Sequence, residues 1–118
     1  MVFPKDLLGI KDLNADQINE ILKTAKIMRE IIDNNNKKTP HLQGKTVITL
    51  FYENSTRTRL SFELASKYLS SNAANVAVGS SSVAKGESLI DTARTINMMG
   101  TDALVIRHQC SGAPHLVA

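Results

Sequence analysis

Hydroxyl and arginine side chains are concentrated in one short stretch of the sequence, "STRTR" at residues 55–59. An apolar, β-branched run, "KTVITLF" at 45–51, comes just before it, and apolar residues at helical spacing follow, so we expect a strand to end and a helix to begin here. The first turn of a helix presents unpaired N–H groups and the positive end of the helix dipole. Small hydroxyl side chains let an anion approach these groups, and arginine adds a charged pair of donors. The stretch is therefore suited to bind phosphate or another compact dianion.

A second arginine, Arg107, follows another predicted strand, "DALVI" at residues 102–106. Ligands of open parallel sheets bind beyond the carboxyl ends of the strands. We therefore expect Arg107 to approach the same anion as Arg57, from a second direction. Arg59 lies two positions after Arg57 and must point elsewhere on a helix, so we expect it to form structural ion pairs.

The same residues also allow a purely structural interpretation. Ser55 would then only cap the helix, and Arg57 and Arg59 would be solvated or paired with Glu53 and Glu63. The position at the end of a strand and the second arginine favour an anion site, but the residues alone leave both interpretations open.

Other polar clusters have simpler interpretations. By its residues alone, the serine-rich loop "GSSSVAKG" at 79–86 is an exposed connector. Glu87, Asp91 and Arg94 have the spacing of an ion-pair ladder on a helix surface. His108 is expected to be structural. The chain has no Walker or G-x-G-x-x-G motif and no metal-ligand spacing, so we predict no metal and no cofactor.

The stretch before the first strand predicts an amphipathic helix. Asn14 can cap this helix together with Gln17, three residues later. Its apolar residues share one face: Ile18, Ile21, Leu22, Ala25, Met28 and Ile32. Residues 33–44 follow as a connector within a single domain, which we expect to span residues 1–118.

The rest of the chain alternates between strands and helices. A second strand is predicted at "ANVAV", residues 74–78, and a third helix from about residue 87, with Gly100 as its terminator. The order β-α-β-α-β predicts an α/β fold, with three α/β/α layers around a parallel sheet. The last segment, "RHQCSGAPHLVA", is expected to be a loop and the beginning of a helix, as in a truncated chain.

Composition limits the classes of protein that fit. A net charge of +3 and an aromatic content of 4% give little support for nucleic-acid binding, which needs basic grooves and stacking rings. No apolar run reaches membrane-spanning length, and the first residues, "MVFPKDLLGI", do not resemble a signal peptide. The single cysteine, Cys110, cannot form an internal disulfide and has no evident activating base, so we expect a cytoplasmic protein and an inert thiol.

Two longer stretches carry a family resemblance. "FYENSTRTRLSFELA" at 51–65 resembles the carbamoyl-phosphate-binding signature of the aspartate/ornithine carbamoyltransferase family, and "KGESLIDTARTINMMGTDALVIRH" at 85–108 continues it. The resemblance begins at the first helix and covers nearly the whole chain. "IRH" after the third strand is similar to the aspartate branch, whereas ornithine enzymes often have "YRG".

The resemblance implies a reaction and roles for particular residues. In the aspartate branch, the carbamoyl group of carbamoyl phosphate moves to the amino group of L-aspartate, which gives N-carbamoyl-L-aspartate and phosphate in de novo pyrimidine synthesis. Ser55, Thr56, Arg57 and Thr58 would hold the phosphate. Thr58 and Arg107 would contact the carbamoyl oxygen and stabilise the charge that develops during attack.

The resemblance also implies partners. Ser81 and Lys85 would reach the active site of a neighbouring subunit in a homotrimer, and Glu53 would pair with arginines of a second domain on closure. That aspartate-binding domain and the fourth strand of the family's first domain are absent from these residues, so the chain alone is expected to be inactive. Regulatory or dihydroorotase partners remain open. The alternatives are an ornithine carbamoyltransferase fragment, a non-catalytic subunit-interaction module, and a generic anion- or nucleic-acid-binding domain.

Overall fold

One central strand organises the molecule, as the computed structural model of residues 1–77 and 88–118 shows. The elements in chain order are η1 (Ile10–Asp12), α1 (Ala15–Asp33), β1 (Thr46–Phe51), α2 (Thr56–Tyr68), β2 (Asn72–Ala77), α3 (Leu89–Met98), β3 (Ala103–Arg107) and α4 (Ala113–Val117). The predicted alternation of strands and helices is confirmed. The second strand begins two residues earlier than predicted, because Asn72 and Ala73 extend its pairing with β1.

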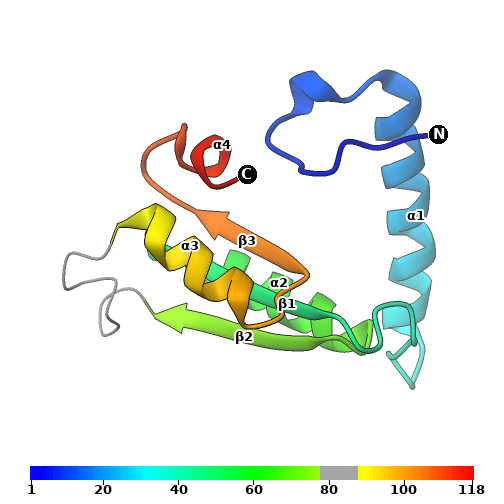
Figure 1. Cartoon of the computed structure of the whole chain (residues 1–118). Helices are drawn as coiled ribbons and strands as arrows, with labels where there is room; N and C mark the ends of the chain where they lie inside the picture. The colour runs from blue at the N-terminus through cyan, green and yellow to red at the C-terminus, as the bar shows by residue number, and fades with distance from the viewer. Residues whose placement is uncertain (78–87) are drawn as a thin grey trace.

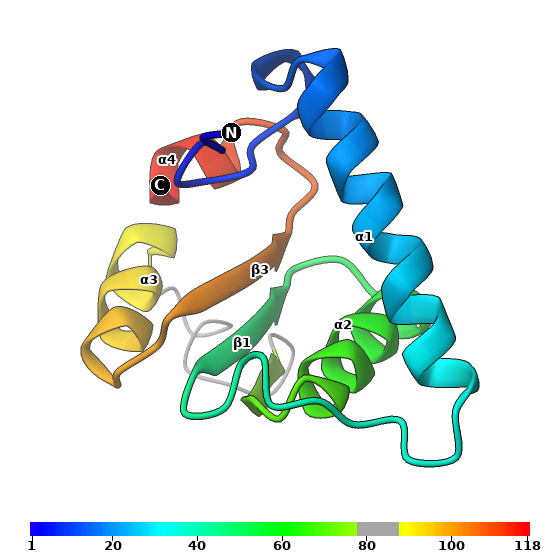
Figure 2. The ribbon, with the colours of Figure 1, turned by 90° about the vertical axis from the view of Figure 1, so that its right-hand side faces the viewer.

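The three strands form a parallel sheet in the order β2-β1-β3. The helix α3 covers one face of the sheet and α2 covers the other, so the predicted three-layer arrangement is confirmed (Figures 1 and 2). The register aligns the ends of all three strands: Phe51 lies beside Ala77 on one side and beside Arg107 on the other. The carboxyl ends of the strands therefore share one edge.

The core lies around β1 because this strand is paired on both sides and covered on both faces. Leu50 is fully buried, and it packs with Ile48 and with Ile96 of α3. Thr49, a polar residue of the same strand, is also almost fully buried. Its hydroxyl donates to the Oδ1 atom of Asn75 on β2 at 2.9 Å, which satisfies the buried polar group.

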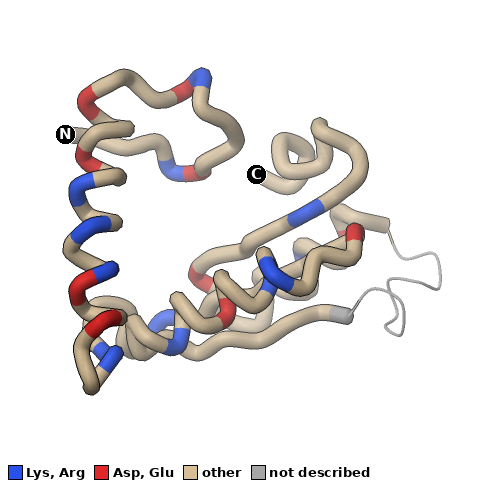
Figure 3. The backbone as a smooth tube through the Cα atoms, turned by 180° about the vertical axis from the view of Figure 1, so that it is seen from behind, with Lys and Arg blue, Asp and Glu red and all other residues tan. Residues whose placement is uncertain are grey.

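The first helix lies beside these layers and packs less closely. It begins with the predicted capping box of Asn14 and Gln17. Its apolar face is largely exposed, since the exposed fraction is 41% for Ile21 and 58% for Leu22. Charged residues run along its length, whereas the strands are almost uncharged (Figure 3).

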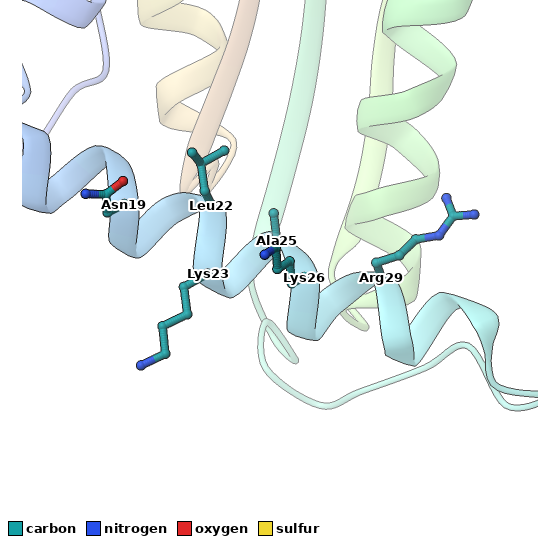
Figure 4. Close-up of a pocket in the computed structure, with 6 residues that line it drawn as sticks. All are labelled: Asn19, Leu22, Lys23, Ala25, Lys26 and Arg29. Carbon is teal, nitrogen blue, oxygen red and sulfur yellow. The ribbon is translucent and has the colours of Figure 1, made fainter.

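A shallow groove of about 600 Å³ lies along this helix. The groove is lined by Asn19, Leu22, Lys23, Ala25, Lys26 and Arg29. Several of these side chains extend from different sides of the helix (Figure 4). Within residues 1–77 and 88–118, no helix combines the length and apolarity needed to cross a membrane. The same ranges contain no group of three His, Cys, Asp or Glu side chains that could hold a metal ion.

Candidate anion-binding site

The end of β1 and the end of β3 are joined directly. The backbone N–H of Tyr52, the first residue after β1, donates to the carbonyl of Arg107 at 2.7 Å. From Tyr52 the chain needs only three more residues to reach Ser55 and the start of α2. The two arginine-bearing stretches that the sequence singles out therefore lie at the same edge of the sheet, as predicted.

The start of α2 has free backbone donors. Ser55 occupies the N-cap position, but its side chain makes no capping hydrogen bond, and its hydroxyl donates instead to the Oγ1 atom of Thr58 at 3.0 Å. The first helical bond joins the N–H of Arg59 to the carbonyl of Ser55 at 3.0 Å. The N–H groups of residues 56–58 have no acceptor within the described part of the chain. No acidic residue occupies this first turn, so the positive end of the helix dipole is not compensated locally.

The structural interpretation of the "STRTR" stretch is wrong in part for the residues that the structure describes: Ser55 makes no side-chain cap and neither arginine is paired, whereas Arg57 is exposed to solvent, as that interpretation allows. Neither Arg57 nor Arg59 is within ion-pair distance of Glu53, of Glu63 or of any other described carboxylate. The expectation that Arg59 forms structural ion pairs is wrong in this part of the chain. The reason is that an exposed pair gains little energy for ordering two long side chains.

Glu53 contacts a different arginine. Its Oε2 lies 3.7 Å from the Nε of Arg107, and the two side chains are 39% and 44% exposed. This contact places a carboxylate beside Arg107, the arginine that is expected to approach the anion from a second direction. The sequence did not suggest the pair, because the two residues are far apart in the chain and meet only through the pairing of β1 with β3.

The remaining predicted residues divide into three groups. Thr58 is half-buried beside Ser55, and Thr56 is exposed in the first turn of α2. Ser81, Lys85 and Glu87 lie outside the described residues. Asp91 and Arg94 form no ion pair with each other or with another described residue, so this part of the predicted surface ladder is wrong.

A second contact at this edge that the sequence did not suggest joins Tyr52 and His108. Their ring centroids are 4.6 Å apart. Each of the two residues is the first after a strand, and β1 and β3 end in register, so the pairing of the strands places the rings side by side. The signal was present in the sequence, but it could be used only once β1 and β3 were known to be neighbours.

Comparisons with known proteins agree with this geometry. Residues 5–118 match the model of the aspartate/ornithine carbamoyltransferase family, carbamoyl-P binding domain. The chain is 72% identical over 114 residues to the aspartate carbamoyltransferase catalytic subunit of Acetivibrio thermocellus and 65% identical to that of Ruminiclostridium cellulolyticum. In both cases the match covers 97% of this chain and 36% of the relative, so the chain spans about a third of the length of these curated relatives.

Solved structures show the same architecture. The catalytic subunit of M. jannaschii aspartate transcarbamoylase superposes with a TM-score of 0.86 at 45% identity, over 97% of this chain and 37% of that one. Aspartate transcarbamoylase from Trypanosoma cruzi, in complex with carbamoyl phosphate, superposes with a TM-score of 0.84 at 33% identity, over 93% of this chain and 35% of that one. By its match over residues 5–118, the chain belongs to the aspartate/ornithine carbamoyltransferase family, where it corresponds to the carbamoyl-phosphate-binding domain.

Proposed function

We propose that this chain is the carbamoyl-phosphate-binding part of an aspartate carbamoyltransferase. The complete enzyme would transfer the carbamoyl group of carbamoyl phosphate to the amino group of L-aspartate, and N-carbamoyl-L-aspartate and phosphate would be released. The aspartate catalytic subunits that the chain resembles support the aspartate branch over the ornithine branch. The T. cruzi enzyme, which has the same fold, has been solved with carbamoyl phosphate and aspartate.

The observation that carries this proposal is the uncapped start of α2. The free N–H groups of residues 56–58, together with Ser55, Thr56, Arg57 and Thr58, would hold the phosphate. A dianion there would complete the hydrogen bonding that the fold leaves open and would balance the helix dipole.

The chemistry needs positioning and charge stabilisation rather than a nucleophile on the enzyme. As the amine attacks the carbamoyl carbon, negative charge develops on the carbamoyl oxygen. Thr58 and Arg107 would stabilise that charge by hydrogen bonds, and the carbon–oxygen bond to phosphate would then break. Glu53 would leave Arg107 when the substrate binds and would pair with arginines of a second domain on closure.

The complete protein would act as a cytoplasmic homotrimer without a cofactor. Ser81 and Lys85, which lie outside the described residues, would complete the site of a neighbouring subunit. The 118 residues alone would bind carbamoyl phosphate without turning it over.

Calorimetric titration of the chain with carbamoyl phosphate tests the site. Arg57→Ala should weaken binding by about 10- to 100-fold, because a charge-assisted pair of hydrogen bonds is lost. Lys26→Ala is the matched control, since it removes a cation from the groove on α1 and should leave the affinity unchanged. Equal weakening by both substitutions would show that binding depends on the overall positive charge of the chain and not on a site at the start of α2.

A chimera tests the activity. The matching third of the Acetivibrio thermocellus subunit would be replaced by this chain, and carbamoyl aspartate formation would be measured with and without Arg107→Ala. We expect turnover that the substitution lowers by more than about 100-fold. An inactive, folded chimera would contradict the proposal, as would turnover by the 118 residues alone at the rate of a complete enzyme.

The exposed apolar face of α1 favours one second candidate, a non-catalytic subunit-interaction module. Residues such as Ile21 and Leu22 would then contact another chain. Sedimentation analysis separates the two functions, because a strictly monomeric chain that binds carbamoyl phosphate would exclude this candidate.

A further inference from the structure

The ring of His108 is held in two ways at the end of β3. Its Nδ1 accepts a hydrogen bond from the backbone N–H of Cys110 at 3.0 Å. The ring also lies against that of Tyr52, with centroids 4.6 Å apart and planes inclined by 47°. Because a backbone N–H can only donate, Nδ1 must be the acceptor, and the ring proton of this tautomer is on Nε2.

Tyr52 gives that ring a fixed surface. Its side chain packs against the core cluster of Ile48, Leu50 and Ile96. Its hydroxyl is buried and has no hydrogen-bond partner in the described ranges, so packing alone holds the ring. Its backbone N–H donates to the carbonyl of Arg107 at 2.7 Å. Tyr52 therefore contacts both Arg107, the last residue of β3, and His108, the first residue of the turn that follows.

Arg107 has few other restraints. It is the last residue of β3, and among the described residues the pairing of this strand with β1 ends at Phe51 and Arg107. The ends of strands open more readily than their centres. The contact between Arg107 and Glu53 is 3.7 Å long and largely solvated, so it adds little restraint. Besides the backbone hydrogen bond from Tyr52 to Arg107, the Tyr52–His108 contact, one residue further on, connects the end of β3 to the core.

We propose that His108 is a positioning residue that holds Arg107 beside the start of α2. The tilted ring contact with Tyr52 fixes the backbone after Arg107, and the hydrogen bond from Cys110 fixes the plane of the ring and the turn that follows. The guanidinium is then directed toward the anion site before ligand arrives. The role in binding rests on the proposed carbamoyl phosphate site, but the restraint on Arg107 exists without a ligand.

Three substitutions of His108 separate the two contacts in the 118-residue chain. His108→Phe keeps a ring for the contact with Tyr52 and removes the acceptor, His108→Asn keeps an acceptor and removes the ring, and His108→Ala removes both. Tyr52→Phe is the matched control, because it keeps the ring and removes only the unpartnered hydroxyl.

Two measurements are made on each variant. The dissociation constant for carbamoyl phosphate should rise about tenfold in His108→Ala and about threefold in the Phe and Asn variants, and should stay unchanged in Tyr52→Phe. Without ligand, the NMR signal of the Arg107 Nε–H group should shift or broaden in His108→Ala and recover in part in the two conservative variants. If His108→Ala does not fold, the Phe and Asn variants decide the result.

A double-mutant cycle separates positioning from general stability. If His108 acts through Arg107, His108→Ala should cause no further loss of affinity in an Arg107→Ala background. An equal loss in both backgrounds, or wild-type affinity in His108→Ala, would overturn the inference and leave the anion site intact. A wild-type chain that does not bind carbamoyl phosphate would overturn the proposed function, whereas an Arg107 signal that still depends on His108 would support the restraint.

Discussion

Two helices of this protein begin after a serine, and they begin differently. Ser88, before α3, accepts a hydrogen bond from the N–H of Asp91 at 3.1 Å, and Asp91 adds a negative charge to the first turn. Ser55, before α2, makes no such bond, because its hydroxyl donates to Thr58. The first turn of α2 has no acidic residue. The start of α3 is capped by its own side chains, whereas the start of α2 leaves N–H donors that a ligand could bind.

The backbone differs at the two serines. Ser88 has φ −70° and ψ 154°, the extended conformation in which an N-cap side chain reaches the next turn. Ser55 has φ −149° and ψ 83°, outside that conformation, and its hydroxyl bonds to Thr58 instead of to the backbone. The start of α1 resembles that of α3, since Asn14 and Gln17 close it with two bonds of 2.8 Å. The N–H donors at a helix start are satisfied by side chains, by water or by a ligand, so the uncapped start of α2 at the ends of the strands is suited to bind an anion.

The largest expected effect comes from closing the open start. Ser55→Asp would supply a carboxylate that accepts the free N–H groups and compensates the helix dipole. We expect carbamoyl phosphate affinity to fall about 100-fold or more, and the free energy of unfolding to rise by about 0.5–1 kcal/mol. Calorimetry and urea denaturation measure the two changes. Retained affinity would show that the anion does not bind at the start of α2.

A smaller effect should distinguish the two serines directly. Ser88→Ala removes a working cap, so the free energy of unfolding should fall by about 1 kcal/mol without a change in ligand affinity. Ser55→Ala removes no cap and should leave stability within about 0.5 kcal/mol while it weakens carbamoyl phosphate binding severalfold. Denaturant titrations of the two variants side by side check this. Equal losses of stability would mean that the two starts do not differ in solution.

The smallest effect concerns the carboxylate beside the open start. Glu53→Gln removes the charge that contacts Arg107 at 3.7 Å. Because the pair is largely solvated, the affinity of the chain for inorganic phosphate should rise only about two- to threefold, and the gain should shrink as salt is added. Glu63→Gln, which removes a carboxylate of α2 that contacts no described arginine, is the control. A fall in phosphate affinity would show that Glu53 organises Arg107 instead of competing for it.

Local pattern was enough for much of this protein. The capping box of α1 involves residues three positions apart, and the helical and strand periodicities are equally local, so the sequence by itself predicted these elements and their order. It also placed the "STRTR" stretch between a strand and a helix. Hydrogen bonds and side-chain faces within a few residues depend little on the rest of the chain.

Contacts between distant residues were decided only by the tertiary structure. The pairing of β1 with β3 brings Arg107 to Glu53 and His108 to Tyr52. The amino-acid composition of β1 and β3 does not specify that these two strands are neighbours. The two serines look alike in the sequence, yet one caps its helix and the other does not. Strand order and the backbone angles of a junction depend on how the crossover helices pack on the two faces of the sheet, which no short window of sequence contains.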